Sequence, residues 1–273
     1  MIFYYSRSMS NDHKLQDLKQ LLSDMKRVII AYSGGIDSTF LLFVAHEVLG
    51  ENAIGVTLVS PSIPDSEVNL AREIANHIGA PHIVLQSNET DDPIYQENTP
   101  DRCYFCRKIT YSMISDYAQR NKCEIVIDGS NADDFDDHRP GRRAAIELGI
   151  KSPLQEVGFS KSEIRQLAHQ NGLPNWDKPS AACLSSRVPY GSPITPKILL
   201  QIGQAENKLK SLGFTQIRVR HYDLTAKIEV PQTQFQDILY YREEISSYFK
   251  CIGYKYVSLD LDGFRSGSLN EVL

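Results

Sequence analysis

Hydrophobic positions in the first half of the chain follow two alternating spacings. Apolar residues recur at helical intervals over 13–25, 38–50, 65–79 and 101–121, and they form short β-branched runs over 27–32, 53–59, 82–86 and 124–129. Runs of the second kind are typical of strands buried on both faces. Strands that alternate with helices at this spacing predict an α/β fold, with a parallel sheet covered by helices on both faces.

The pattern changes after residue 190. A helical stretch over 195–213 is followed by two strands with strict alternation, 215–221 and 225–230, then by one long helix over 232–253 and a last strand over 254–261. Alternation of period two indicates an antiparallel pair that is solvated on one face. We therefore predict two domains, a parallel-sheet domain over 1–190 and a smaller α+β domain over 191–273.

Composition and charge narrow the class of protein. The 273 residues are 41% hydrophobic and 23% charged with a net charge of −5, and the segment after residue 190 holds ten Lys and Arg against nine Asp and Glu. A nucleic-acid binder usually carries a basic face, so the expected partner is a small molecule and not RNA or DNA.

No apolar run approaches the length of a membrane helix, and the apolar start is too short for a signal peptide. We expect a cytoplasmic protein without a membrane partner. The helical pattern begins only after Asn11, which leaves Met9 as an alternative start to Met1.

The string SGGIDS, Ser33–Ser38, stands between a predicted strand and a predicted helix. Gly34 and Gly35 allow a sharp turn that exposes backbone N–H groups, and these amides with the helix N-terminus form an anion site suited to pyrophosphate. Ser33 and Ser38 add hydroxyl donors, and Asp37 suits Mg²⁺ or a helix cap. The string is neither a Walker A loop nor G-x-G-x-x-G. The plain alternative is a strand-to-helix turn without a ligand.

Two further polar segments follow predicted strands. Ser60 comes after the second strand, and Asp128 with Gly129 comes after the fourth. Parallel sheets bind ligands beyond the carboxyl ends of their strands. We therefore expect these residues to meet a nucleotide or Mg²⁺ beside the glycine loop.

Five cysteines and no secretion signal argue against a disulfide framework. Cys103 and Cys106 begin a predicted helix, and Cys183 lies in the later segment KPSAACLSSR. These three thiols fit an iron–sulfur cluster, a zinc site with His138 or His221 as fourth ligand, or a redox pair with a resolving thiol. The other two, Cys123 and Cys251, are predicted to be buried structural thiols.

The SGGIDS string resembles the PP-loop ATP pyrophosphatases, which implies cleavage of ATP between its α- and β-phosphates and transfer of AMP to a substrate oxygen. The longer strings AYSGGIDST, ENTPDRCYFC, DGSNADDFDDHRPG, SPLQEVGFSKSEIRQLA, SSRVPYG, IRVRHYDLTAKIEVP and LDLDGFRSG resemble the LarE family. Members of that family are sulfur transferases that build the nickel-pincer cofactor of lactate racemase. The resemblance extends from about Lys26 to Asn270.

This resemblance implies a PP-loop domain with a smaller C-terminal domain for substrate binding and oligomerisation, in a trimer or hexamer. ATP with Mg²⁺ would adenylate a carboxylate of a pyridinium dicarboxylic acid mononucleotide, and sulfur would then displace AMP to give a thiocarboxylate. Asp37 would be catalytic, and the nucleotide would be bound by Ala31, Ser33, Gly34, Gly35, Asp37, Ser38, Ser60, Asp128 and Gly129.

The family has two sulfur sources. One type sacrifices the sulfur of its own cysteine at the position that is Ala182 here, so this chain departs from that type. The other type carries C-x-x-C and a later cysteine. The resemblance therefore implies that Cys103, Cys106 and Cys183 are catalytic ligands of a 4Fe-4S cluster that carries sulfide.

Arg218 and Arg220 alternate with apolar residues on one predicted strand, and Arg265 lies in the glycine-flanked string GFRSG. By resemblance, the three guanidinium groups would hold the phosphate or carboxylates of the substrate. An anonymous R-x-R strand would more commonly be a solvated face with surface ion pairs.

Three rival functions fit parts of the sequence. A PP-loop tRNA thiolase would need a basic RNA-binding domain, which the charge count does not show. An ammonia-using amidotransferase would not need clustered thiols. The non-enzymatic alternative is a zinc-stapled nucleotide-binding scaffold.

Overall fold

A computed structural model describes residues 11–135, 140–179, 182–265 and 267–272, so Met1, Met9 and His138 lie outside the described residues. The chain forms two compact units. The first comprises Met1–Val59, Asp65–Ser87 and Cys103–Ala181, and the second comprises Ser60–Pro64, Asn88–Arg102 and Ala182–Leu273. The domain boundary after residue 190 stays a prediction.

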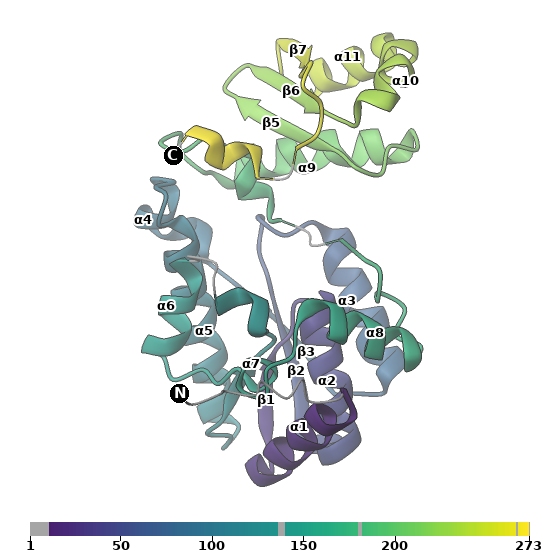
Figure 1. Cartoon of the computed structure of the whole chain (residues 1–273). Coiled ribbons are helices and arrows are strands. Elements are labelled where there is room, and N and C mark those ends of the chain that lie inside the picture. The colour runs from purple at the N-terminus through teal and green to yellow at the C-terminus, as the bar shows by residue number, and fades with distance from the viewer. Residues whose placement is uncertain (1–10, 136–139, 180–181, 266, 273) are drawn as a thin grey trace, which may run out of the picture. The chain divides into compact units, whose positions relative to one another are not determined.

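The first unit is built on a four-stranded parallel sheet in the order β3-β2-β1-β4 (Figure 1). Its strands are β1 (Val28–Ala31), β2 (Ala53–Val59), β3 (His82–Gln86) and β4 (Val126–Asp128). The expected α/β fold with a parallel sheet is therefore confirmed, and each strand coincides with a β-branched run of the sequence.

Helices cover both faces of this sheet (Figure 1). Ile29 packs into the core formed with α5, whereas its neighbour Ile30 packs into the opposite core, formed with α1 and α2. This alternation explains why the strand is apolar at every position. The helices are α1 (Asn11–Met25), α2 (Ile36–Leu49), α3 (Asp65–Ile78), α5 (Arg102–Arg120), α6 (Pro140–Glu147), α7 (Pro153–Glu156) and α8 (Lys161–Gln170).

The strand order places a switch point between β1 and β4. From β1 the chain moves outward through β2 to β3, and it then returns to the other side of β1 to form β4. The segments that follow β1 and β4 therefore leave the sheet side by side, and ligands of open α/β sheets bind in the crevice at such a point.

The second unit contains a three-stranded sheet in the order β5-β6-β7. As expected, β5 (Arg218–Tyr222) and β6 (Thr225–Glu229) are antiparallel, while β7 (Tyr256–Leu259) runs parallel to β6. Apolar residues of α9 (Pro196–Ser211) and α11 (Arg242–Cys251) pack with one face of this sheet (Figure 1). The short helices α4 (Pro93–Gln96) and α10 (Phe235–Tyr240) also belong to this unit.

The single long helix expected over 232–253 is wrong. The chain forms α10 and α11 with Tyr241 between them, whose backbone has φ −88 and ψ 11. The Tyr241 ring packs edge-on against Phe214, with ring centroids 6.3 Å apart. This aromatic contact lies at the break between the two helices, which periodicity alone does not reveal.

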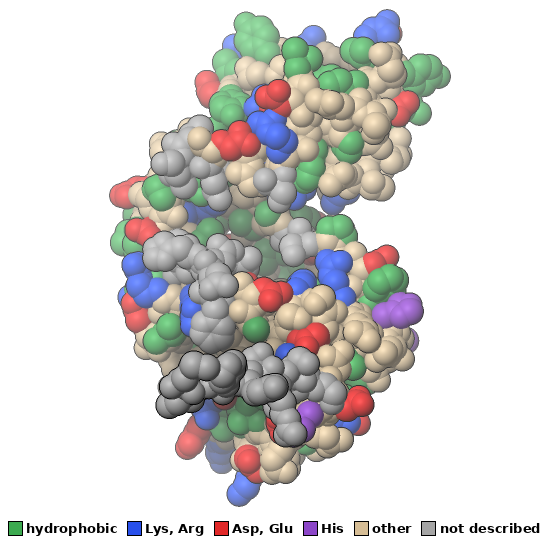
Figure 2. All heavy atoms as spheres, in the orientation of Figure 1, with side chains coloured by type: hydrophobic (Ala, Val, Ile, Leu, Met, Phe, Trp, Pro, Cys, Tyr) green, Lys and Arg blue, Asp and Glu red, His purple; other side chains and the backbone are tan. Residues whose placement is uncertain are grey.

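Charged side chains of both signs are interspersed on the face drawn in Figure 2, in keeping with the balanced charge of the sequence. Within the described part of the chain, no helix has the length and apolar character needed to cross a membrane.

Candidate active site

The loop after β1 has the geometry of an anion cradle. Gly34 has φ +72, and a Cβ at this position would lie 2.8 Å from the Cβ of Ala71, so only glycine fits. The Ser38 hydroxyl accepts from the Ser33 N–H at 3.2 Å and donates to the Gly35 carbonyl at 3.0 Å. These bonds fold the loop over the first turn of α2, where free N–H groups attract a negatively charged ligand.

Asp37, in the first turn of α2, is paired with Lys161 at the start of α8. Burial raises the pKa of Asp37, and the hydrogen bond from Lys161 opposes that rise. The second carboxylate oxygen, Oδ1, is buried and accepts no hydrogen bond from the described residues. A buried oxygen without a donor is an available ligand position for a cation.

Asp128 is the last residue of β4, Gly129 follows it, and both lie at the same edge. Ala31 of β1 pairs with Asp128, and a Cβ on Gly129 would lie only 2.7 Å from the backbone nitrogen of Ser38. The structure thus brings the ends of β1 and β4 together with the glycine loop. Ser60, by contrast, belongs to the second unit, where its hydroxyl contacts that of Ser62 at 2.8 Å.

The carboxylate of Asp128 is only 3% exposed and is fully engaged. Its Oδ1 accepts from the Ser130 N–H at 3.1 Å and from the Ser152 hydroxyl at 2.7 Å, and its Oδ2 accepts from the Tyr111 hydroxyl at 2.6 Å and the Ser130 hydroxyl at 3.0 Å. A carboxylate has about four acceptor positions. Asp128 therefore anchors its loop and has no oxygen left for Mg²⁺.

The three predicted ligand cysteines form no disulfide with the described residues, and they belong to different units. Cys103 and Cys106 lie at the start of α5 in the first unit, exposed and half-buried respectively, and the half-buried Cys183 lies in the second unit. No group of three His, Cys, Asp or Glu residues in the described ranges is arranged to hold a metal ion. Convergence of the three thiols stays a prediction.

The expectation of two buried structural thiols is half right. Cys123 is 3% exposed and lies in the core around α5, whereas Cys251 is exposed. Cys251 is the last residue of α11, where helical periodicity places its side chain on the solvent face. Of the two histidines weighed as zinc ligands, His221 is buried and its Nδ1 lies 3.2 Å from the Tyr254 hydroxyl.

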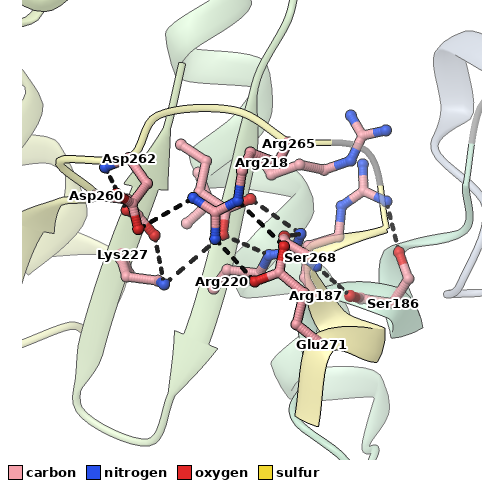
Figure 3. Close-up of polar contacts among 12 residues, drawn as sticks. Ser186, Arg187, Arg218, Arg220, Lys227, Asp260, Asp262, Arg265, Ser268 and Glu271 are labelled. Atoms are coloured by element: carbon pink, nitrogen blue, oxygen red, sulfur yellow. Dashed lines mark hydrogen bonds and ion pairs between the residues drawn. The ribbon is translucent and has the colours of Figure 1, made fainter. Parts of the chain in front are cut away.

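Two of the three predicted substrate arginines are neutralised within the second unit (Figure 3). Arg220 forms a bidentate ion pair with Glu229, at 2.9 Å for both bonds, and also donates to the Ser186 carbonyl at 2.7 Å. Arg265 is paired with Asp262 at 3.2 Å and with Glu271 at 3.0 Å.

Arg218 differs from both. Its guanidinium lies 5.0 Å from the centre of the Phe264 ring and donates to its neighbour's carbonyl, and it has no ion pair with the described residues. Burial, and then the charges of Arg187 and Arg220, lower the pKa of Arg218 to about 10. A half-buried cation beside two others favours an incoming anion.

Comparison with known proteins decides the family. A PP-loop domain model matches residues 9–138. The pyridinium-3,5-bisthiocarboxylic acid mononucleotide synthase of Lactiplantibacillus plantarum is 39% identical over 261 residues, which cover 95% of each chain. The chain belongs to this family of synthases, the LarE family. It is an ATP-dependent enzyme with a PP-loop domain.

Other relatives extend over the same length. An uncharacterised protein of Synechocystis sp. is 44% identical over 96% of this chain and 98% of its own length. An uncharacterised protein of Methanocaldococcus jannaschii is 31% identical over 93% of this chain and 98% of its own length.

Three residues of this LarE-family enzyme hold candidate functional segments within their own units, and no sequence motif points to them. Lys161 pairs with Asp37, as described above. Asn175, only 3% exposed, donates to the Gly34 carbonyl at 2.9 Å and to the Thr39 hydroxyl at 3.0 Å. It therefore fastens the glycine loop to α2 from a segment far along the chain.

The third is Arg187, whose guanidinium forms a buried bidentate pair with Glu206 at 2.8 and 3.0 Å. It also donates to the carbonyls of Ala182 and Cys183, at 2.8 and 2.9 Å. Arg187 thus fixes the position of the backbone at Ala182 and Cys183. In the sequence, Arg187 follows two serines, and this pattern does not predict a buried ion pair or contacts with the backbone near Cys183.

Proposed function

We propose that this enzyme uses ATP to adenylate a carboxylate of a pyridinium biscarboxylate mononucleotide and then replaces oxygen by sulfur to give a thiocarboxylate. The main support is the full-length similarity to the Lactiplantibacillus plantarum synthase, together with the glycine loop at the switch point of the sheet. A carboxylate is a poor electrophile until its oxygen becomes part of a good leaving group, and AMP is such a group.

Two displacements make up the reaction. A substrate carboxylate oxygen attacks the α-phosphorus of ATP, and the bond to the β-phosphate breaks with release of pyrophosphate. A sulfur nucleophile then attacks the activated carbonyl carbon, and the bond to AMP breaks. The N–H groups of Ile36, Asp37 and Ser38 in the first turn of α2 would hold the pyrophosphate, because the first N–H groups of a helix have no intrahelical partner and need no rearrangement at the moment of reaction.

Mg²⁺ fits the first step. Asp37 offers a buried carboxylate oxygen that accepts no hydrogen bond from the described residues, and Mg²⁺ is bound through one or two carboxylates with phosphate oxygens. The bound ion would neutralise charge on the phosphates. Lys161 would then be released from Asp37 and could donate to a phosphate oxygen.

For the sulfur source we propose a 4Fe-4S cluster held by Cys103, Cys106 and Cys183. Three thiolates suit the donor chemistry of such a cluster, and when bound it would supply the sulfide. One contact inside the second unit supports the pairing of the two segments. Arg102, which precedes Cys103 in the sequence, donates to the Ser185 carbonyl at 3.1 Å, two residues beyond Cys183.

For the substrate we propose that Arg218 binds the phosphate or a carboxylate, with Arg220 and Arg265 beside it. The missing ion-pair partner of Arg218 among the described residues supports this role. We also propose that residues 191–273 serve substrate binding and oligomerisation in a trimer or hexamer, which light scattering of the purified enzyme tests.

The decisive experiment uses anaerobically purified enzyme with ATP, Mg²⁺, sulfide and the pyridinium biscarboxylate mononucleotide. We expect AMP, pyrophosphate and a product whose mass shows oxygen exchanged for sulfur. Iron and labile sulfide should accompany the wild type and the Cys251→Ala control, and Cys183→Ala should lose both and keep adenylation. No AMP with this substrate would overturn the proposed function, and bound zinc without iron would overturn the cluster.

A further inference from the structure

A chain of hydrogen bonds, exposed at Arg107 and buried at Tyr111 and Asp128, joins α5 to the end of β4 in the first unit. Arg107 Nη1 donates to the Tyr111 hydroxyl at 2.8 Å, and that hydroxyl donates to Asp128 Oδ2 at 2.6 Å. Tyr111 is 2% exposed and Asp128 is 3% exposed. Arg107 and Tyr111 lie one turn apart on α5, which carries Cys103 and Cys106, and Asp128 ends β4.

The positive charge of Arg107 compensates the negative charge of Asp128 along this series of hydrogen bonds. A buried carboxylate is costly unless a cation or several donors compensate it. Asp128 obtains four donors and, through the Tyr111 hydroxyl, the guanidinium of Arg107. Burial raises the pKa of Tyr111, so its hydroxyl keeps the proton that it donates to Asp128.

A glycine lies beside each end of this series of hydrogen bonds, Gly141 next to Arg107 and Gly129 after Asp128. At Gly141 a Cβ would lie 2.8 Å from Cγ of Arg107, so glycine is needed for the arginine side chain to pass. At Gly129 a Cβ would lie 2.7 Å from the nitrogen of Ser38, so the residue after Asp128 touches the glycine loop directly. The Gly129 end therefore transmits a shift to Ser38, since close-packed backbone does not yield easily, whereas the contact at Gly141 is with a side chain.

We propose that Tyr111, held by Arg107, is a positioning residue that fixes the end of β4 against the phosphate loop and the first turn of α5 at a set place beside it. The effect of Tyr111 on ATP binding requires only that the enzyme binds ATP as a PP-loop protein. Its second effect, on sulfur transfer, rests on the proposed function, because that assigns roles to Cys103 and Cys106.

Tyr111→Phe tests the proposal because it removes one hydroxyl and leaves the ring in place. Tyr117→Phe, a half-buried tyrosine on the same helix, is the matched control. We expect Tyr111→Phe to weaken ATP binding about 10-fold by calorimetry, equivalent to ~1.4 kcal/mol. Hydrogen exchange in the peptide covering residues 33–38 should be faster, although this loop does not contain the substituted residue. The control should match the wild type in both measurements.

The second effect is measured as a split between the two half-reactions. At saturating ATP, thiocarboxylate formation by Tyr111→Phe should fall at least about five-fold further than pyrophosphate release, since positioning errors of the order of 1 Å are costly in rate. Arg107→Lys should retain more activity than Arg107→Gln.

Unchanged ATP affinity and unchanged loop exchange in a folded Tyr111→Phe enzyme would overturn the positioning role. Wild-type enzyme that binds ATP but makes no thiocarboxylate would instead overturn the proposed function, and the calorimetry would still decide the first effect of Tyr111.

Discussion

Lys161 donates a hydrogen bond to Asp37 of the glycine loop, and 124 positions of sequence separate the two residues. Burial nevertheless raises the pKa of Asp37. The folded state thus holds the proton more tightly than the unfolded chain does. The stability contributed by that proton is fully present below the unfolded pKa, and it is lost as pH rises through the folded pKa.

Asp37→Asn removes this titration and gives the first prediction. The wild type should gain stability relative to the variant as pH is lowered from about 7 to about 4. Urea unfolding of both proteins across that range measures the difference, and a difference that does not change with pH would contradict the raised pKa. At neutral pH the variant should be folded and should not form AMP.

The two loop glycines should respond differently to alanine. Gly34→Ala places a Cβ 2.8 Å from Ala71 at a positive φ, whereas Gly35 has an extended backbone and meets only the Ser33 hydroxyl at 3.3 Å. Gly34→Ala should lower the free energy of unfolding by at least ~1–3 kcal/mol. Gly35→Ala should leave it equal or slightly higher. Equal losses in urea denaturation would argue against the described loop conformation.

Neutral substitution of the two strand arginines should have opposite effects on stability. Arg220→Gln leaves the buried carboxylate of Glu229 without its bidentate partner, and removing one member of a buried pair costs about 3–5 kcal/mol. Arg218→Gln removes a cation that already repels Arg187 and Arg220, so the free energy of unfolding should stay level or rise. Chemical denaturation of the wild type and both variants measures the free energy of unfolding of each. Binding of the mononucleotide should fall for Arg218→Gln.

Asn98 supports the turn that follows Cys183. It is fully buried, and its side-chain amide donates to the carbonyls of Pro189 and Ser192 at 2.7 and 3.0 Å, while its Oδ1 accepts from Arg102. Asn98→Ala leaves these groups unpaired and should cost about 3 kcal/mol. Asn121→Ala, at an exposed position, is the control. If thermal unfolding shows that Asn98→Ala loses no more stability than Asn121→Ala, the supporting role of the Asn98 side chain is contradicted.

The sequence revealed most of the first sheet because its strands are apolar on both faces. Runs such as 27–32 and 53–59 indicate strands buried on both faces, and the glycine loop after β1 indicates the edge at which a ligand is expected. It did not reveal the break at Tyr241, because a helical pattern continues across that residue on both sides.

The site was predicted only where local rules apply. The rule for the ends of parallel strands brings Gly129 to the loop of Ser33–Ser38, as the structure shows. The partners Lys161, Asn175 and Tyr111 come from helices and turns elsewhere in the chain, and only tertiary packing selects them. The same limit applies to Asp128, whose position at a strand end was predicted but whose saturated carboxylate was not.

The guanidinium of Arg218, which has no ion pair with the described residues, has a practical consequence for anyone who handles this enzyme. Its acidic neighbours Glu206 and Glu229 are already paired with Arg187 and Arg220, so an anion from the medium can approach it, and sulfate or phosphate matches its planar donors well. Buffers that contain these ions would compete with the mononucleotide and raise its apparent Kd, whereas a chloride solution of low ionic strength leaves the position open. If Arg218 binds the substrate as proposed, salt choice therefore decides whether weak binding is detected at all.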